Sequence, residues 1–198
     1  ASMIHPLSTA KEIAFYLQVS KSRMALIMEE HLAKFKEAEK ETAIRTLIVT
    51  GMKDALEDAE AKPIPAESAD PMVRTWRRMM AGAYPPVPKS TMGPDDLAAI
   101  LYSGGTTGIS KAAVSTHYNL VVNGLQIKSW MPDCREGKET VLMAIPLFHV
   151  YGMVAGMIFA IAAGSSMVMV PNPRDMKDVL HNIDKFHPSI YPGVPTMY

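Results

Sequence analysis

The chain has 198 residues, with 20 Lys and Arg against 20 Asp and Glu, so its formal net charge is zero. Domains that bind nucleic acids usually carry a basic excess or stripe, and this balance argues against that class. Hydrophobic residues make up 48% of the sequence, which is enough for a buried core and excludes a disordered chain. The single cysteine, Cys134, rules out an internal disulfide and a cysteine-based zinc site, and it fits a reduced, cytoplasmic setting.

The first half of the chain predicts alternating helices and strands before a proline-rich crossover. Thr9 and Glu12 have the spacing of a capping box, followed by apolar residues on one helical face. Seven prolines between Pro63 and Pro94 favour loops there. We therefore expect a first α/β lobe segment over residues 1–94. Its further elements are a strand at Met24–Met28, a helix at Glu29–Glu41, a strand at Thr46–Val49 and a short helix near Val73–Met80.

The second half, residues 95–198, predicts another α/β lobe segment. Thr116 is a suitable N-cap for a helix at His117–Trp130. Asn172 and Pro173 suit the start of a last helix, whose inner stripe would be Met176, Val179, Leu180 and Ile183. The other expected elements are strands at Leu97–Tyr102, Val141–Ile145 and Met167–Val170 and a helix at Val150–Ala163. The alternation indicates a layered α/β fold with a largely parallel sheet flanked by helices.

No charged residue lies between Glu139 and Arg174. A membrane-spanning helix needs about 20 apolar residues, so this stretch has to be weighed as one. Pro146, three glycines and the pair Ser165–Ser166 interrupt it. We interpret it as three buried elements, because buried parallel strands also show unbroken apolar runs, and a membrane protein remains the alternative.

Residues 102–111 form a loop rich in glycine and hydroxyl side chains directly after an apolar strand. Glycines can take positive φ and point backbone N–H groups at an anion. Lys111 adds a compact positive charge. The Walker and Rossmann patterns do not fit, since Ala112 follows Lys111 and no residue separates Gly104 from Gly105. We predict a polyphosphate cradle made by Ser103, Gly104, Gly105, Thr106, Thr107, Gly108 and Lys111; a flexible turn is the simpler alternative.

This loop resembles the signature loop of the adenylate-forming superfamily, which includes acyl-CoA synthetases, luciferases and peptide-synthetase adenylation domains. That loop commonly reads Tyr-Thr-Ser-Gly-Thr-Thr-Gly-x-Pro-Lys-Gly. Gly104, Ser110 and Ala112 stand where Ser, Pro and Gly are common, and the Gly104 variant is associated with fatty-acyl ligases. The matching residues are Tyr102, Gly105, Thr106, Thr107, Gly108 and Lys111.

Further motifs follow in the family's order along the chain. Residues 146–149, Pro-Leu-Phe-His, are similar to a motif that lines the acyl pocket. Residues 192–196 resemble the family's Pro-Gly-Val-Pro-Thr segment. Residues 5–12 are similar to an opening motif of long-chain fatty-acyl ligases, with His5 in place of Asn.

The resemblance implies an ATP-dependent, AMP-forming acyl-CoA ligase. It would activate a medium- or long-chain fatty acid as the acyl-adenylate and transfer the acyl group to coenzyme A, with Mg²⁺ bridging the ATP phosphates. Residues 103–108 would grip the phosphates. Lys111 and His149 are the catalytic candidates: Lys111 as a supporting charge, and His149 at the carboxylate pocket. No protein metal ligand is expected, since the histidines lack ligand spacing.

Later motifs of the family are absent from the sequence, so we expect a fragment of the large N-terminal domain that is inactive alone. Unpaired sheet edges would allow a homodimer, and a membrane-peripheral location is a variant of the cytoplasmic one. Two alternatives remain open besides the membrane protein. One is an adenylation domain for an amino or aryl acid, and the other is a non-catalytic module that kept the loop as a nucleotide-binding relic.

Overall fold

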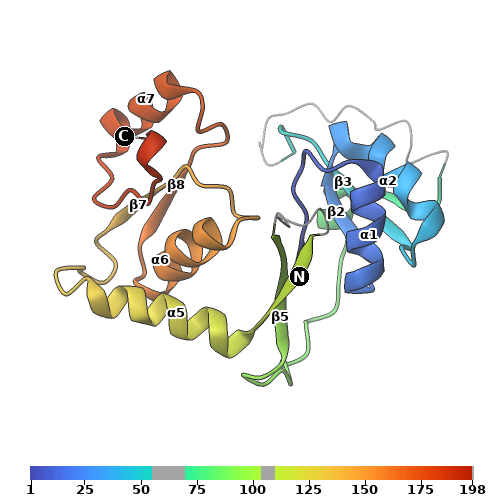
Figure 1. Cartoon of the computed structure of the whole chain (residues 1–198), viewed down its shortest axis with the longest axis horizontal. Coiled ribbons are helices and arrows are strands. Elements are labelled where there is room, and N and C mark those ends of the chain that lie inside the picture. The colour runs from blue at the N-terminus through green and yellow to red at the C-terminus, as the bar shows by residue number, and fades with distance from the viewer. Residues whose placement is uncertain (55–69, 104–109, 198) are drawn as a thin grey trace. The chain divides into compact units, whose positions relative to one another are not determined.

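The computed structural model describes residues 1–54, 70–103 and 110–197. The chain divides into two compact units (Figure 1). We call Ser2–Thr91 the N-terminal unit, and Met92–Tyr198 together with Ala1 the C-terminal unit.

The N-terminal unit is built on a parallel sheet in the order β2-β3-β4. The predicted strands at 24–28 and 46–49 are confirmed. The sheet packs against a core of buried apolar side chains from α1 and α2, including Ile13, Leu17 and Phe35. The elements are β1 (Ser2–Met3), α1 (Ala10–Ser20), β2 (Met24–Met28), α2 (Leu32–Ala38), β3 (Thr46–Thr50), β4 (Val73–Thr75) and α4 (Trp76–Met80), with 3₁₀ turns at Glu29–His31 and Glu39–Glu41.

The capping box at the start of α1 is confirmed. The Glu12 amide donates to Thr9 Oγ1 at 3.3 Å, and the Thr9 amide donates to Glu12 Oε2 at 2.7 Å. The Thr9 amide, followed by the Thr9 hydroxyl, lowers the pKa of Glu12. The helix is thereby fixed at its first turn, with Ile13 and Leu17 buried on its inner face.

Two helix predictions in this unit need correction. Residues 73–75 are not helical, because Val73 and Thr75 are β-branched and pair in parallel with β3, and the helix begins only at Trp76. Thr75 caps it by accepting a hydrogen bond from the Arg78 amide. The single helix expected at 29–41 is instead α2 with a 3₁₀ turn at each end.

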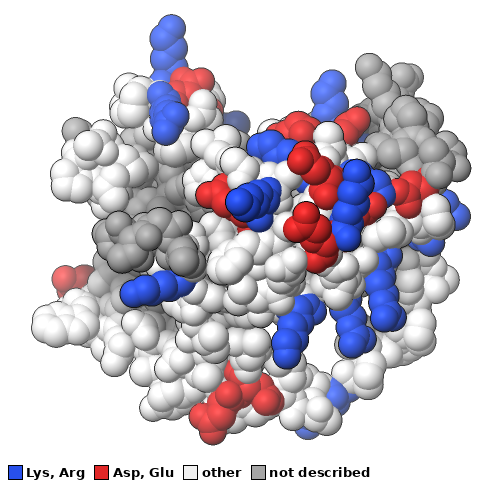
Figure 2. Space-filling model, turned by 45° about the vertical axis from the view of Figure 1, so that its right-hand side comes forward, with Lys and Arg blue, Asp and Glu red and all other residues white. Residues whose placement is uncertain are grey.

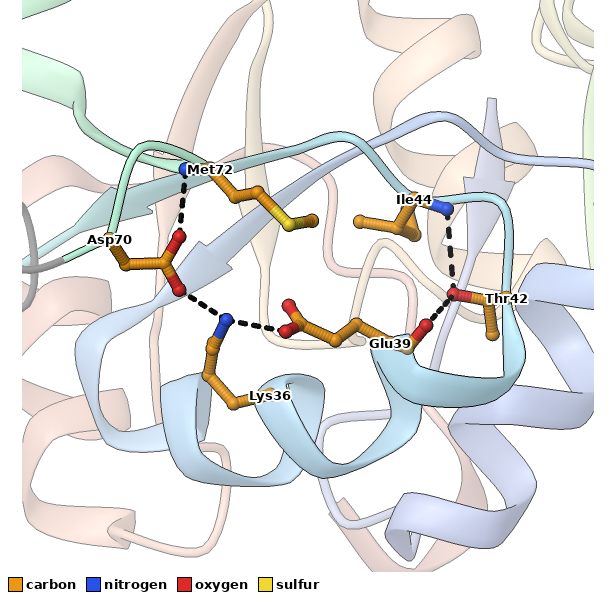
Figure 3. A network of polar contacts seen from close by, with 6 residues as sticks. All are labelled: Lys36, Glu39, Thr42, Ile44, Asp70 and Met72. Carbon is orange, nitrogen blue, oxygen red and sulfur yellow. Dashed lines mark hydrogen bonds and ion pairs between the residues drawn. The ribbon is translucent and has the colours of Figure 1, made fainter.

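Charged side chains in the N-terminal unit form a structural network around Lys36 (Figure 3). The Lys36 ammonium donates to Glu39 Oε1 at 2.5 Å and to Asp70 Oδ2, and Asp70 Oδ1 accepts from the Met72 amide at 2.8 Å. The contact with Asp70, followed by that with Glu39, raises the pKa of Lys36, and the same ammonium lowers the pKa of Asp70. The network joins α2 to the residues just before β4.

Figure 2 shows Lys and Arg side chains interspersed with Asp and Glu side chains over the upper part of the face drawn, and several Lys and Arg side chains without acidic neighbours lower on the same face.

The C-terminal unit combines one antiparallel and one parallel pair of strands. β5 and β6 pair antiparallel, β7 and β8 pair in parallel, and Ile190 adds a parallel bridge to Val141. The elements are β5 (Leu97–Ser103), β6 (Lys111–Thr116), α5 (His117–Trp130), β7 (Thr140–Met143), a π-helix (Gly152–Ile158), α6 (Phe159–Ala162), β8 (Ser166–Met169), α7 (Met176–Phe186) and a 3₁₀ turn (Pro195–Met197).

The helix predicted at His117–Trp130 is confirmed as α5, whereas β6 was not predicted. Thr116 caps α5: its hydroxyl accepts from the Asn119 amide at 3.2 Å, and its own amide donates to Asn119 Oδ1 at 3.0 Å. Residues 111–116 carry no clear alternation of apolar and polar side chains, so only their pairing with β5 identifies the strand.

The start of the last helix was predicted wrongly. Asp175 is its N-cap and accepts from the amides of Lys177 and Asp178, while Asn172 caps a preceding turn by accepting from the Arg174 amide. Val179 is buried and Ile183 packs against the same cluster, as expected. The other two members of the predicted stripe, Met176 and Leu180, are exposed.

The uncharged stretch contributes the core of the C-terminal unit. Val141 in β7 and Phe159 and Ala160 in α6 are completely buried and pack together. In the described parts of the chain, no helix combines the length and apolar character needed to cross a bilayer. The structure therefore confirms the layered α/β class with parallel strands and gives no spanning helix at 141–170.

Candidate functional site

A cavity of about 710 Å³ lies in the C-terminal unit, between α5 and the helical segment at residues 150–162. Such a volume is typical of sites for small organic molecules. Its walls are mostly apolar, with a few amide and hydroxyl groups. The lining residues are Ser115, Asn119, Leu120, Asn123, Ile127, Met131, Val150, Tyr151, Val154, Ala155, Phe159, Ile190, Tyr191 and Pro192.

Along α5 the lining changes from mostly polar residues at one end of the cavity to apolar residues at the other, and we call these its polar and apolar ends. Asn119, Asn123 and Ile127 follow at helical spacing along α5, and the rise of eight residues from Asn119 to Ile127 is about 12 Å. Ser115 lies before the polar end, and Met131 lies beyond the apolar end. A molecule with a polar head and an apolar tail would match this gradient.

Two contacts show that α5 and the facing helical segment run in the same direction, side by side as in Figure 1. Gly124 packs directly against Ile158, and one turn later the Lys128 ammonium donates to the Ala162 carbonyl at 3.1 Å. Val150, at the start of the segment, therefore lies toward the start of α5. The polar end of the cavity is thus also the end nearest to residues 146–150.

Glycine permits the close approaches that shape the cavity. A Cβ on Gly124 would lie 2.7 Å from Ile158 Cγ2, and one on Gly152 would lie 2.4 Å from the Pro146 carbonyl oxygen. Residues 150–162 are helical, as predicted, but the central seven form a π-helix, in which the Phe159 amide reaches back to the Val154 carbonyl. π-Helical turns are uncommon and occur frequently at functional sites.

His149 lies at the start of this helical segment and is exposed. Its Nδ1 accepts a hydrogen bond from the Tyr151 amide at 3.2 Å, and its own amide donates to the Pro146 carbonyl at 3.0 Å. Val150 and Tyr151 line the cavity, whereas His149 lies just outside the lining. Because Nδ1 accepts from a backbone amide, the other ring nitrogen, Nε2, is the one that can turn to a ligand.

The described part of the predicted phosphate loop consists of its two ends. Ser103 and Lys111 are register partners across β5 and β6, and the Ser103 hydroxyl donates to the Lys111 carbonyl at 3.5 Å. The Lys111 side chain is exposed. Gly104, Gly105, Thr106, Thr107 and Gly108 lie outside the described residues. Among the hydrogen bonds and ion pairs of the described residues, none joins His149 to Ser103 or Lys111.

Sequence reasoning missed the contribution of α5 to the cavity. Asn119, Asn123 and Ile127 recur every four residues, which is a signal for one helical face. Their mixed polarity disguised that face as ordinary surface, and apart from Gly124 no residue of the helix is fully buried.

The decisive observation comes from comparison with known families. The family model described as "AMP-binding enzyme" matches residues 1–198. The chain belongs to this family. The membership confirms the resemblance drawn from the loop and the later motifs.

Curated relatives are consistent with this membership. The chain is 43% identical over 103 residues to a long-chain-fatty-acid–CoA ligase of Bacillus subtilis, covering 52% of the chain and 18% of the relative. It is 27% identical over 207 residues to the ligase of the same name in Escherichia coli O6:H1, covering 98% of the chain and 37% of the relative. The chain therefore spans well under half the length of these enzymes.

The fold matches that of the apo structure of Mycobacterium smegmatis MbtA, with a TM-score of 0.80 and 22% identity, covering 99% of the chain and 34% of that structure.

Proposed function

We propose that this member of the AMP-binding enzyme family takes part in the ATP-dependent activation of a carboxylic acid, with a medium- or long-chain fatty acid as substrate. The acid carboxylate attacks the α-phosphorus of ATP, the bond to the β-phosphate bridging oxygen breaks, and pyrophosphate leaves. The coenzyme A thiolate then attacks the acyl carbonyl, and AMP leaves as the thioester forms.

The observation that carries this proposal is the cavity with its polarity gradient. An acyl tail fits the apolar end near Ile127 and Phe159, where burying each methylene is worth about 0.8 kcal/mol. The carboxylate then lies at the polar end, toward Val150 and the neighbouring His149. His149 would hydrogen-bond the carboxylate through Nε2, with its ring orientation fixed by the Tyr151 amide.

The phosphate chain of ATP would be held by residues 103–108, with Lys111 as a supporting charge. The pairing of Ser103 with Lys111 fixes both ends of this segment on rigid strands. Positive and N–H groups placed before the reaction stabilise charge that moves onto pyrophosphate without the cost of reorganisation.

Magnesium enters this scheme with its nucleotide, as MgATP. Within the described ranges, no group of three or more His, Cys, Asp or Glu side chains could hold a metal ion. Mg²⁺ commonly binds through substrate phosphates and few protein ligands, which is compatible with this finding. The predicted homodimer and the cytoplasmic or membrane-peripheral location stay predictions.

Acid-dependent exchange of pyrophosphate into ATP tests the first half-reaction. The assay uses protein expressed from the complete open reading frame, with fatty, aryl and amino acids. We expect exchange with fatty acids, and a loss of about 10²-fold on Lys111→Ala. Lys138→Ala, a change at another exposed lysine of the same unit, is the matched control and should leave exchange unchanged.

The other outcomes separate the alternatives. Exchange with only aryl or amino acids would favour an adenylation domain for such acids. Equally weak ATP binding by the parent protein, Lys111→Ala and Thr106→Ala, without any exchange, would favour a nucleotide-binding relic.

A further inference from the structure

A second hollow, of about 300 Å³, adjoins the apolar end of the first cavity. The two hollows share two lining residues, Met131 and Ile190. These two side chains therefore form the wall between them. The other residues that line the second hollow are Trp130, Pro132, Asp133, Cys134, Glu139 and Ser189.

The backbone on both sides of this wall is fixed. Met131 follows α5 directly, and its amide donates to the Lys128 carbonyl at 3.1 Å while its carbonyl accepts from the Cys134 amide at 3.0 Å. Ile190 donates to the Thr140 carbonyl at 3.1 Å and accepts from the Leu142 amide at 2.9 Å. Since the backbone is held in this way, only the side chains of Met131 and Ile190 can change the width of the passage between the two hollows. Ile190 is β-branched and stiff, whereas Met131 is unbranched and can change shape.

The hollow behind the wall contains a buried carboxylate and does not suit the methyl end of an acyl chain. The Glu139 carboxylate is buried there, accepting from the Ser189 hydroxyl at 2.6 Å and from the Arg135 amide at 3.0 Å. These hydrogen bonds, that from Ser189 first, lower the pKa of Glu139, so its carboxylate is charged at neutral pH. An acyl tail placed against this charged group would offer it no hydrogen-bond partner, which is unfavourable.

We propose that Met131 sets the longest acyl chain that the cavity accepts, because its side chain closes the apolar end against the hollow that contains the Glu139 carboxylate. This inference rests on the proposed function and adds the residue that selects among fatty acids by length. Ile190 is the fixed half of the same wall.

The test compares Met131→Ala and Met131→Phe with Met157→Ala. Met157 is a matched control, because it packs half-buried against the same core cluster as Met131 but lines neither hollow. Acid-dependent pyrophosphate exchange is measured with saturated acids of increasing length. Met131→Ala removes three heavy atoms, so we expect the preferred acid to lengthen by about two carbons, at about fourfold per methylene. Met131→Phe should shorten the preferred acid, and Met157→Ala should leave the preference unchanged.

Cys134 offers a second readout that needs no catalysis. It is the single cysteine of the chain and lines the hollow behind the wall. In Met131→Ala, a long acid should occupy the space that the Met131 side chain leaves, next to this hollow, and should slow alkylation of Cys134 by N-ethylmaleimide. In the parent protein and in Met157→Ala the same acid should leave the rate unchanged.

Each outcome decides the proposal. Opposite shifts in Met131→Ala and Met131→Phe, or protection of Cys134 in Met131→Ala alone, support it. The proposal would be overturned if the preferred chain length did not change, or if it shifted equally in Met157→Ala. It would also be overturned if Cys134 were alkylated at the same rate in all proteins. If the parent protein activates no acid, the proposed function fails, and the alkylation rates still decide whether Met131 closes the cavity.

Discussion

The two units use their side chains differently. The N-terminal unit carries most of the charged residues, and its Lys36–Glu39–Asp70 network joins a helix to the segment before a strand. The C-terminal unit contains the long uncharged stretch, and the same stretch supplies both its core and much of the cavity wall. Charged side chains therefore make structural contacts in the N-terminal unit, while we expect substrate binding and catalysis in the C-terminal unit, where charged residues are fewer.

Packing differs in the same way. The β2-β3-β4 sheet buries Leu47, Val49 and Val73 completely. In the C-terminal unit, glycines bring α5 and the π-helix together at Gly124, yet a cavity of about 710 Å³ remains beside them. Cavities in cores weaken stability, so an open volume of this size is consistent with a role in binding.

The largest expected effect tests this difference in packing. Leu47→Ala should lower the free energy of unfolding by about 2–5 kcal/mol, because it opens a new void in a filled core. Val154→Ala should cost within about 1 kcal/mol, because Val154 already faces open space. Urea unfolding of both variants measures the two losses. Equal losses would mean that the two units are packed alike.

A smaller effect concerns the close approach at Gly124. Gly124→Ala places a methyl group against Ile158 and should destabilise the protein by about 1–3 kcal/mol, while changing the shape of the cavity. Gly93→Ala is the control, since the nearest atom to its new Cβ would be 3.9 Å away. Thermal unfolding compares the two. If both variants melted at the same temperature, the contact between Gly124 and Ile158 would not require a glycine.

The smallest effect is the pH dependence of the Lys36 network. Because the pKa of Asp70 is lowered, its contribution to stability is present above its ordinary pKa and is lost as pH falls through the lowered value. Because the pKa of Lys36 is raised, its contribution is present below its ordinary pKa and is lost as pH rises through the raised value.

Lys36→Met should flatten both limbs of the melting temperature plotted against pH. Lys40→Met, a change at an exposed lysine of the same helical region, should keep both limbs. Identical profiles for the two variants would show that the network contributes nothing.

Local signals in the sequence predicted what local physics controls. The structure confirms two helices predicted from their capping residues, Thr9 and Thr116. It also confirms three strands predicted from apolar runs, β2, β3 and β5. The sequence failed where tertiary pairing decides. Val73–Thr75 became a strand because β3 offers it partners, and β6 exists only through its pairing with β5.

The candidate site was predictable only in part. The loop and His149 were predicted from motifs, which can be recognised from their order along the chain, and their roles in the site stay predictions. The cavity could not be predicted in this way, because its α5 wall depends on which face of a weakly amphipathic helix lies against the π-helix. Asn119 and Asn123 resemble solvent-exposed residues until that packing is known.

The most direct test of the account fills the cavity. Ala155→Trp places a large side chain into the space between α5 and the π-helix, while Ala113→Trp places the same side chain on the exposed β6 strand. Acid-dependent pyrophosphate exchange with a long-chain fatty acid, measured on correctly folded protein from the complete open reading frame, should be lost in Ala155→Trp and kept in Ala113→Trp. Undiminished exchange in Ala155→Trp would contradict the claim that this cavity holds the acid.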